Sequence, residues 1–398
     1  MFKIQNIRFV FLLALLVVTA LSYHPNFANA VQFEGGVNPL NRIINILAVL
    51  AAAVSFDWQV WTKNKFIRIF LLGIVVVWIE AILIDQLGYT DQLLGEARNI
   101  TLAFLFLLIG YSVRISQKSF YLLLFVYSLT VAYSTYFQMV QHSGGFVITD
   151  LYIGYGKNAM GVMCASSCVA LFVLAIKDGN KHIRMLSWIM FGFILLLSVG
   201  IRARSAFLAV FIILTLILYM ERKEGLSMQK MSWLVFGFVV VVIIILLVPN
   251  LLRSLSGFIW DSLTENREED LFTGRGVQNR LAIRVVSRSF WFGNMALKEE
   301  YSYMIHNYVL RQLSSYGFIG AIPVLFLYFK VVFFVIIRMF KNKVKISMVG
   351  YLAMFVLVII SMVEPTIPFA PGTSVILPFV LLGITMRNQS GIINSIKM

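Results

Sequence analysis

The stretch YGFIGAIPVLFLYFKVVFFVII, Tyr316–Ile337, carries Lys330 as its one charged residue. A helix of about 20 apolar residues crosses the roughly 30 Å hydrocarbon core of a bilayer. With 60% hydrophobic and 13% charged residues, the chain repeats this pattern. We expect about twelve spans, near residues 7–23, 41–56, 66–84, 99–113, 119–140, 158–176, 185–200, 204–220, 231–249, 316–337, 345–363 and 373–386. The sequence therefore predicts an all-α polytopic membrane protein.

The net charge of +15 is unevenly distributed over the connecting loops. Loops on one side carry most of the Lys and Arg residues and few acids, whereas the other side carries both signs in equal number. By the positive-inside rule, the basic side and both termini face the cytoplasm, so the excess charge indicates topology and not nucleic-acid binding. Residues 1–30 also fit a cleavable signal peptide, which leaves two alternatives for the first span.

One polar segment divides the chain. Residues 250–304 form the longest loop, between nine predicted spans in residues 1–249 and three in residues 305–398. Long loops of this kind are often functional. Within it, Gln278–Phe292 has arginines every fourth residue, typical of an amphipathic helix on a membrane surface. Its arginines either anchor to lipid head groups or bind a substrate.

Two arginines are unusual because they stand on the outer side. Arg202 and Arg204 lie in a short predicted hairpin, RARSA, which holds no acidic residue. Charged groups at a membrane interface are costly, and guanidinium groups bind phosphate oxygens well. These arginines are therefore interpreted as an anion site, with simple snorkelling to the surface as the alternative.

His306 and Asn307 are polar residues shortly before the tenth predicted span. If the chain is helical from Tyr303 onward, His306 lies on one stripe with Gly317 and Gly320, because eleven residues are close to three turns. The glycines then let a neighbouring helix approach closely. Histidine can serve as a general base near neutral pH, although a lone histidine is also often structural.

Cysteine and metal chemistry are not indicated. Cys164 and Cys168 lie within the sixth predicted span, where we interpret them as small packing residues. The sequence has no Cys/His cluster with metal-ligand spacing. We therefore expect neither a metal nor another cofactor.

The motif His306-Asn307, nine residues, Gly317, two residues and Gly320 resembles the hallmark of the O-antigen polymerase and O-antigen ligase superfamily. Further similarities are Arg204-Ser205 in RARSA, Thr273-Gly274-Arg275 in the long loop, and Asn158 with Gly161 in YGKNAMG. One departure is that the tryptophan often found after the TGR motif is absent.

This resemblance implies a GT-C-like fold and a metal-independent glycosyltransferase of the cytoplasmic membrane. Its partners would be a polyprenyl-diphosphate-linked glycan donor, a glycan acceptor, membrane lipid and a chain-length regulator. A lateral opening would admit the lipid-linked substrates. The implied catalytic residues are His306, Arg204 and Arg275, and the implied substrate-binding residues are Arg202, Asn307, Arg280, Arg284 and Asn158.

Several functions remain open from the sequence. A polymerase joins lipid-linked repeat units, whereas a ligase transfers the glycan to a lipid A core or another terminal acceptor; we favour the polymerase because that group is larger. A secondary transporter is a remote alternative, since transporters tend to have internal repeats and ionisable residues at the midplane. A purely structural scaffold would not explain the outer arginines.

Overall fold

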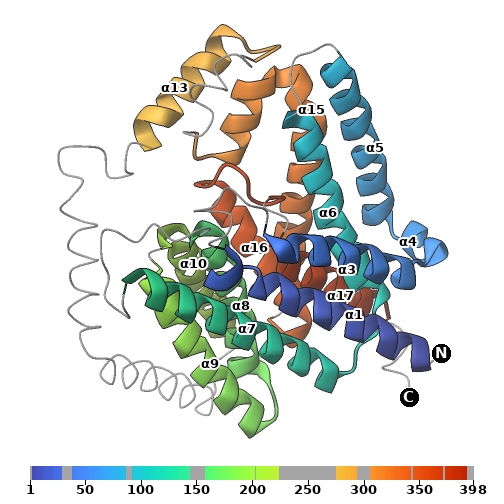
Figure 1. Ribbon diagram of the computed structural model, residues 1–398, viewed down its shortest axis with the longest axis vertical. Helices are drawn as coiled ribbons and strands as arrows, with labels where there is room; N and C mark the ends of the chain where they lie inside the picture. Colours follow the sequence, from blue (N-terminus) through green and yellow to red (C-terminus); the bar gives the residue numbers. More distant parts are fainter. Residues whose placement is uncertain are drawn as a thin grey trace.

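The computed structural model describes residues 2–28, 38–86, 92–143, 157–201, 203–223, 275–293, 305–341, 344–370 and 373–391. Within these ranges the regular structure is helical, with no strand (Figure 1). The elements are α1 (Phe2–Leu21), α3 (Pro39–Ser55), α4 (Trp58–Lys63), α5 (Lys65–Gln86), α6 (Gln92–Ser112), α7 (Gln117–Ser143), α8 (Lys157–Lys177), α9 (Lys181–Gly200), α10 (Arg204–Lys223), α13 (Arg275–Arg288), α15 (Tyr308–Lys341), η2 (Ile346–Met348), α16 (Val349–Ser361) and α17 (Ile376–Gly391).

Seven of the described helices are long and apolar enough to cross a membrane: α1, α5, α6, α7, α8, α9 and α15. Four shorter apolar helices, α3, α10, α16 and α17, accompany them. Each of these eleven helices overlaps one of the expected ranges, but only the seven long ones meet the length of a membrane span. The expected range 231–249 lies outside the described residues. The protein is therefore a multi-pass helical membrane protein, as the sequence predicted.

Burial distinguishes the helices at the centre from those at the periphery. In the apolar stretch of α8, 94% of the residues are buried, and both Cys164 and Cys168 are fully buried free thiols there. In α15, by contrast, Phe326, Phe333 and Phe340 are more than half exposed. Exposed aromatic side chains along a membrane-crossing helix are suited to contact with lipid.

Loops that were predicted on the same side lie together at one end of the bundle. Arg8 Nε donates to the Val54 carbonyl oxygen over 2.9 Å, and the Arg114 backbone N–H donates to Gln5 Oε1 over 3.0 Å. These contacts join the start of α1, the end of α3 and the loop after α6. We call this the basic end, because the positive-inside pattern predicts that it faces the cytoplasm.

The opposite end gathers the loops predicted on the other side. Asn38 Nδ2 donates to the Ser22 carbonyl oxygen over 2.8 Å, which ties the start of α3 to the end of α1. The hydroxyls of Tyr23 and Thr373 lie 2.7 Å apart, and so bring the segment before α17 to the same place. We call this the outer end.

The helix α15 is broken at Gly317. This residue has φ 66° and ψ −175°, so Tyr308–Tyr316 and Phe318–Lys341 are two helical segments joined at a kink. The helix also begins at Tyr308, after His306. The expectation of one helical stripe running from His306 through Gly317 to Gly320 is therefore wrong, because a residue with positive φ cannot continue an α-helix.

The kink is where the end of α13 joins the bundle. The backbone N–H groups of Phe318 and Ile319 begin the second helical segment, and they donate to the carbonyl oxygens of Phe290 and Trp291 over 2.6 and 3.1 Å. The rings of Phe290 and Phe318 stack with centroids 5.1 Å apart. A helix thus covers most of the expected range 278–292, but α13 ends at Arg288, and Phe290 and Trp291 lie in the turn that contacts α15.

Candidate functional site

Asn307 organises the start of α15 at the outer end. Its Oδ1 accepts the Leu310 backbone N–H over 3.0 Å, the bond of a helix N-cap. Its Nδ2 donates to the Met362 carbonyl oxygen over 3.0 Å. Both polar groups of the side chain are engaged, so Asn307 holds the segment after α16 beside half-buried His306.

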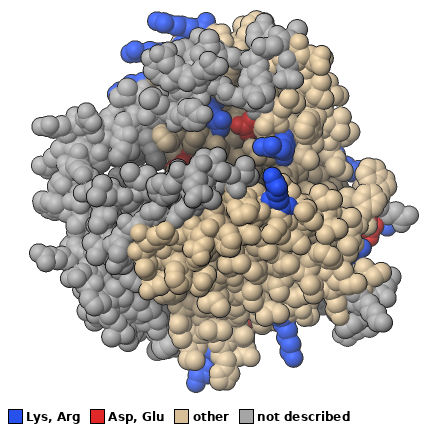
Figure 2. All heavy atoms as spheres, in the orientation of Figure 1, with Lys and Arg blue, Asp and Glu red and all other residues tan. Residues whose placement is uncertain are grey.

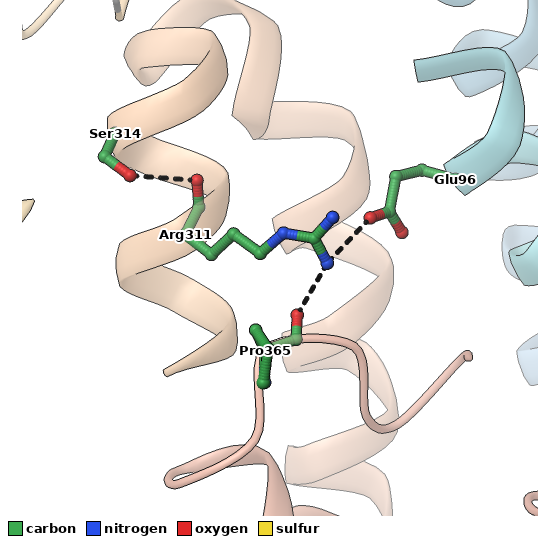
Figure 3. A network of polar contacts seen from close by, with 4 residues as sticks. All are labelled: Glu96, Arg311, Ser314 and Pro365. Carbon is green, nitrogen blue, oxygen red and sulfur yellow. Dashed lines mark hydrogen bonds and ion pairs between the residues drawn. The ribbon is translucent and has the colours of Figure 1, made fainter. Parts of the chain in front are cut away.

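Arg311 extends this junction one turn further along α15, and Figure 3 shows its side chain between Glu96 and Pro365. Its Nη1 donates to the Pro365 carbonyl oxygen over 3.1 Å and lies 3.4 Å from Glu96 Oε1. Glu96 comes from α6 and its side chain is only 6% exposed. A buried carboxylate is costly without a cationic partner, so this ion pair fixes α15, α6 and the 362–370 segment together.

Glu364 is the second buried carboxylate of the region, with 6% exposure. Its Oε2 accepts a hydrogen bond from Asn158 Nδ2 over 3.1 Å. Asn158 lies in the first turn of α8. The residues Asn158 and Asn307, which were singled out by separate motifs, therefore bind positions two residues apart on one segment.

The turn between α9 and α10 lies against the start of α8. A Cβ placed on Gly161 would be only 2.5 Å from Ala203 Cβ and 3.1 Å from Ala206 Cβ, so the two backbones approach closely. Arg204 is the first residue of α10, and its side chain lies outside the described atoms, as does the whole of Arg202. Ala203 and Ala206 thus bring the start of α10 against the first turns of α8, where Asn158 also lies.

Four arginines of the long loop, Arg275, Arg280, Arg284 and Arg288, belong to α13. Arg275 is its first residue, with a side chain outside the described atoms, and Arg280 and Arg284 are exposed. In Figure 2, basic side chains project at the top left, in the direction of α13, and a recess below them holds both basic and acidic atoms. Because α13 packs against α15, these arginines are held near the helix that Asn307 caps.

A cavity of about 780 Å³ opens at the same end, between α3, α5 and α6. Its polar part contains Asn41, Asn45, Arg98 and Asn99, whose side chains make no hydrogen bond or ion pair within the described part of the chain. Its apolar part includes Ile44, Ala48, Leu102 and Leu105, and its wall includes Trp78 and Ala159. Because Ala159 follows Asn158, the cavity adjoins the site.

Several of these residues were not found from the sequence. Glu96 and Arg311 each lie at the end of an apolar helix, where a charged residue is common. Their pairing depends on which helices are neighbours, and sequence position alone does not reveal that. Glu364 could have been noticed, because it is a lone carboxylate in the proline-rich turn EPTIPFAP, Glu364–Pro371.

Comparison with known protein families and with curated proteins gives no match. The family resemblance therefore depends on the motifs themselves. The described residues contain no group of three or more His, Cys, Asp or Glu side chains that could hold a metal ion. Among the described residues, the groups gathered at this junction include the His306 imidazole, the Glu96 and Glu364 carboxylates, the Asn158 and Asn307 amides and the Arg311 guanidinium.

Proposed function

We propose that the protein is a glycosyltransferase that polymerises polyprenyl-diphosphate-linked oligosaccharide repeat units at the outer face of the cytoplasmic membrane. The observation that carries the proposal is the junction on residues 362–365. There the starts of α8 and α15 are joined by Asn158 and Asn307, and the start of α10 packs against α8. Residues from three distant motifs could therefore act on one substrate.

In the proposed reaction, a hydroxyl oxygen of the acceptor sugar attacks the anomeric carbon of the donor glycan. The bond from this carbon to the diphosphate oxygen breaks, and its electron pair leaves with the polyprenyl diphosphate. His306 accepts the hydroxyl proton. Arg202, Arg204 and Arg275 stabilise the negative charge that develops on the leaving group, a role for which preorganised cations are effective.

The remaining polar groups position the reactants. Arg311 and Glu96 fix the 362–370 segment, and Asn158 and Glu364 present an amide and a carboxylate that can bind sugar hydroxyls. Arg280 and Arg284, on α13, contact the glycan or the diphosphate. The cavity between α3 and α6 combines a polar region with an apolar one, which suits a lipid-linked sugar that enters from the bilayer.

This proposal includes an arrangement of about twelve spans in a GT-C-like fold. It also has the long loop contacting the glycan chains; within 250–304 only residues 275–293 are among those described. A ligase would use the same donor site but a different acceptor, such as a lipid A core oligosaccharide. The two reactions differ in their product: a polymerase makes a ladder of chain lengths, and a ligase makes a single transfer. A chain-length regulator would act only on the first.

The test uses purified full-length protein in lipid with a synthetic polyprenyl-diphosphate repeat unit, and product length is followed by gel. We expect a ladder with the wild type and its loss in His306→Ala and Arg204→Ala. His182→Ala and Arg68→Ala are matched controls, because both residues are exposed and belong to the basic-end half of the molecule. Normal ladders from His306→Ala and Arg204→Ala would refute the assignment of the site, and a single transfer to an added lipid A core would favour the ligase.

A further inference from the structure

A second cavity, of about 630 Å³, lies at the basic end, between the start of α5 and the second half of α15. Its volume is within the roughly 300–1,000 Å³ range of sites for small ligands. Its lining includes the cations Lys63, Lys65, Lys330 and Arg338 and the apolar side chains of Phe333 and Ile337. This cavity is separate from the one at the outer end and shares none of its lining residues.

The charges in this cavity all have one sign. Its lining includes four cationic side chains, three of lysine and one of arginine, and no Asp or Glu. The start of α5, which Asn64 Oδ1 caps by accepting the Phe66 and Ile67 backbone N–H groups over 2.9 and 3.4 Å, also borders this cavity. The N-terminal end of a helix dipole is positive and so adds to the positive potential there. Cations gathered around one space repel each other, so an anion bound among them is favoured because it reduces this repulsion.

The other wall of the cavity is apolar, and its side chains are exposed on the outside of the helix bundle. Phe333 is 59% exposed and Ile337 49% exposed, and the exposed side chains of Phe329 and Phe340 continue the same face of α15. A soluble anion gains nothing from such a surface. A lipid gains from both parts, because its phosphate can lie among the cations while its acyl chains lie along the aromatic residues.

We propose that this cavity binds the phosphate head group of an anionic phospholipid, of the phosphatidylglycerol class, from the leaflet at the basic end. Lys65 and Arg338 approach the phosphate from α5 and α15, and Lys330 reaches it from within the span. The bound lipid would join the first half of the bundle to the last. This site goes beyond the proposed glycosyl transfer and does not depend on it.

The test is native mass spectrometry of the full chain in detergent, titrated with phosphatidylglycerol or with phosphatidylcholine. We expect one preferentially retained phosphatidylglycerol in the wild type. In Lys65→Gln/Arg338→Gln we expect affinity to fall by about fivefold for each cation removed, or about 25-fold in all. The matched control is Lys118→Gln/Lys181→Gln, which removes two exposed basic-end lysines on α7 and α9 that do not line the cavity.

Retention of phosphatidylglycerol by the control variant and its loss from the double variant support the proposal. Equal retention of the two lipids by the wild type, or equal losses in both variants, overturns it. A third titration with inorganic phosphate distinguishes the source of the anion. If phosphate binds the wild type without lipid and displaces phosphatidylglycerol at millimolar concentration, the cavity is a site for a soluble anion and the lipid proposal fails.

Discussion

Gly293 and Gly317 face each other through their backbones, and both have positive φ, 67° and 66°. A Cβ on Gly317 would be 2.3 Å from the Gly293 nitrogen, and a Cβ on Gly293 would be 2.3 Å from the Gly317 nitrogen. No larger residue fits at either position without moving the backbone. This pair of glycines therefore fixes the end of α13 to the kink of α15.

Gly317→Ala should be strongly destabilising. The substitution forces a left-handed conformation on alanine, which costs about 1–2 kcal/mol, and adds a backbone clash. Thermal unfolding in detergent should show a clear fall in Tm and poor recovery of monodisperse protein. Gly95→Ala is the control, because no atom lies within 4 Å of its added Cβ and alanine favours a helix. A Tm equal to that of the wild type in Gly317→Ala would contradict the anchoring role.

Arg311→Gln should destabilise the protein by about 3 kcal/mol, because it leaves Glu96 buried without a cationic partner. Glu96→Gln/Arg311→Gln should recover part of this loss, since both charges are then absent. A double-mutant cycle on the free energy of unfolding measures their coupling. If the losses of the two single variants simply add, the ion pair contributes no coupling energy and the prediction is wrong.

Asn158→Asp should reduce transfer more than tenfold near neutral pH. The new carboxylate lies at hydrogen-bond distance from Glu364, and two like charges in a partly buried site repel. Lowering the pH should restore part of the activity by protonating one of them. Asn180→Asp is the matched control, because Asn180 caps α9 at the basic end and aspartate caps a helix equally well. A similar loss in both variants would show that the effect is not local to the site.

The cavity between α3 and α6 gives a prediction about substrate binding. Arg98→Gln should raise KM for the lipid-linked substrate about tenfold with little change in kcat, because a charge-assisted hydrogen bond contributes about 1.5–3 kcal/mol. Arg42→Gln is the control, since Arg42 is exposed on α3 but does not line the cavity. Unchanged KM in Arg98→Gln would remove this cavity from the substrate path.

His24 should make stability depend on pH. It is 7% exposed and stacks on Tyr133, with ring centroids 5.2 Å apart, and burial lowers its pKa below the ordinary value of 6.5. As pH falls below about 6.5, His24 is protonated in the unfolded state before it is protonated in the folded state. The free energy of unfolding is therefore highest above this pH and decreases as pH falls toward the lower pKa of the folded state. Thermal unfolding between pH 7.5 and 5 should show this loss in the wild type and a smaller one in His24→Phe. Equal slopes in the two proteins would refute it.

The local pattern of the sequence predicted much of the fold. Long apolar runs such as 316–337 became helices, and the four-residue spacing of Arg280, Arg284 and Arg288 identified α13. Both signals depend on neighbouring residues alone, because span length and helix periodicity are local properties. The break at Gly317 was missed because glycine fits both a helix and a turn, and only the approach of Gly293 selects the turn.

The sequence likewise predicted some features of the candidate site and missed others. Motif spacing indicated His306, Asn307, Arg204 and Asn158 as chemically important, but it did not indicate how they are connected. Asn158 and Glu364 are 206 positions apart, and Arg311 lies far from Glu96 in sequence. Which polar helix ends meet depends on how the helices pack against each other.

The helical membrane class of the protein and its seven long apolar helices follow from the pattern of the amino-acid sequence, which also predicts that basic loops gather at one end. The reason is that polar backbone groups and charged side chains are costly in hydrocarbon, and this cost depends on each segment's own residues. The packing of the helices is needed to see that the 362–370 segment joins α6, α8 and α15, and that the turn after α13 is held at the kink of α15. The reason is that buried partners such as Glu96 and Arg311 must satisfy each other across the fold, and that requirement is visible only once the helices are packed.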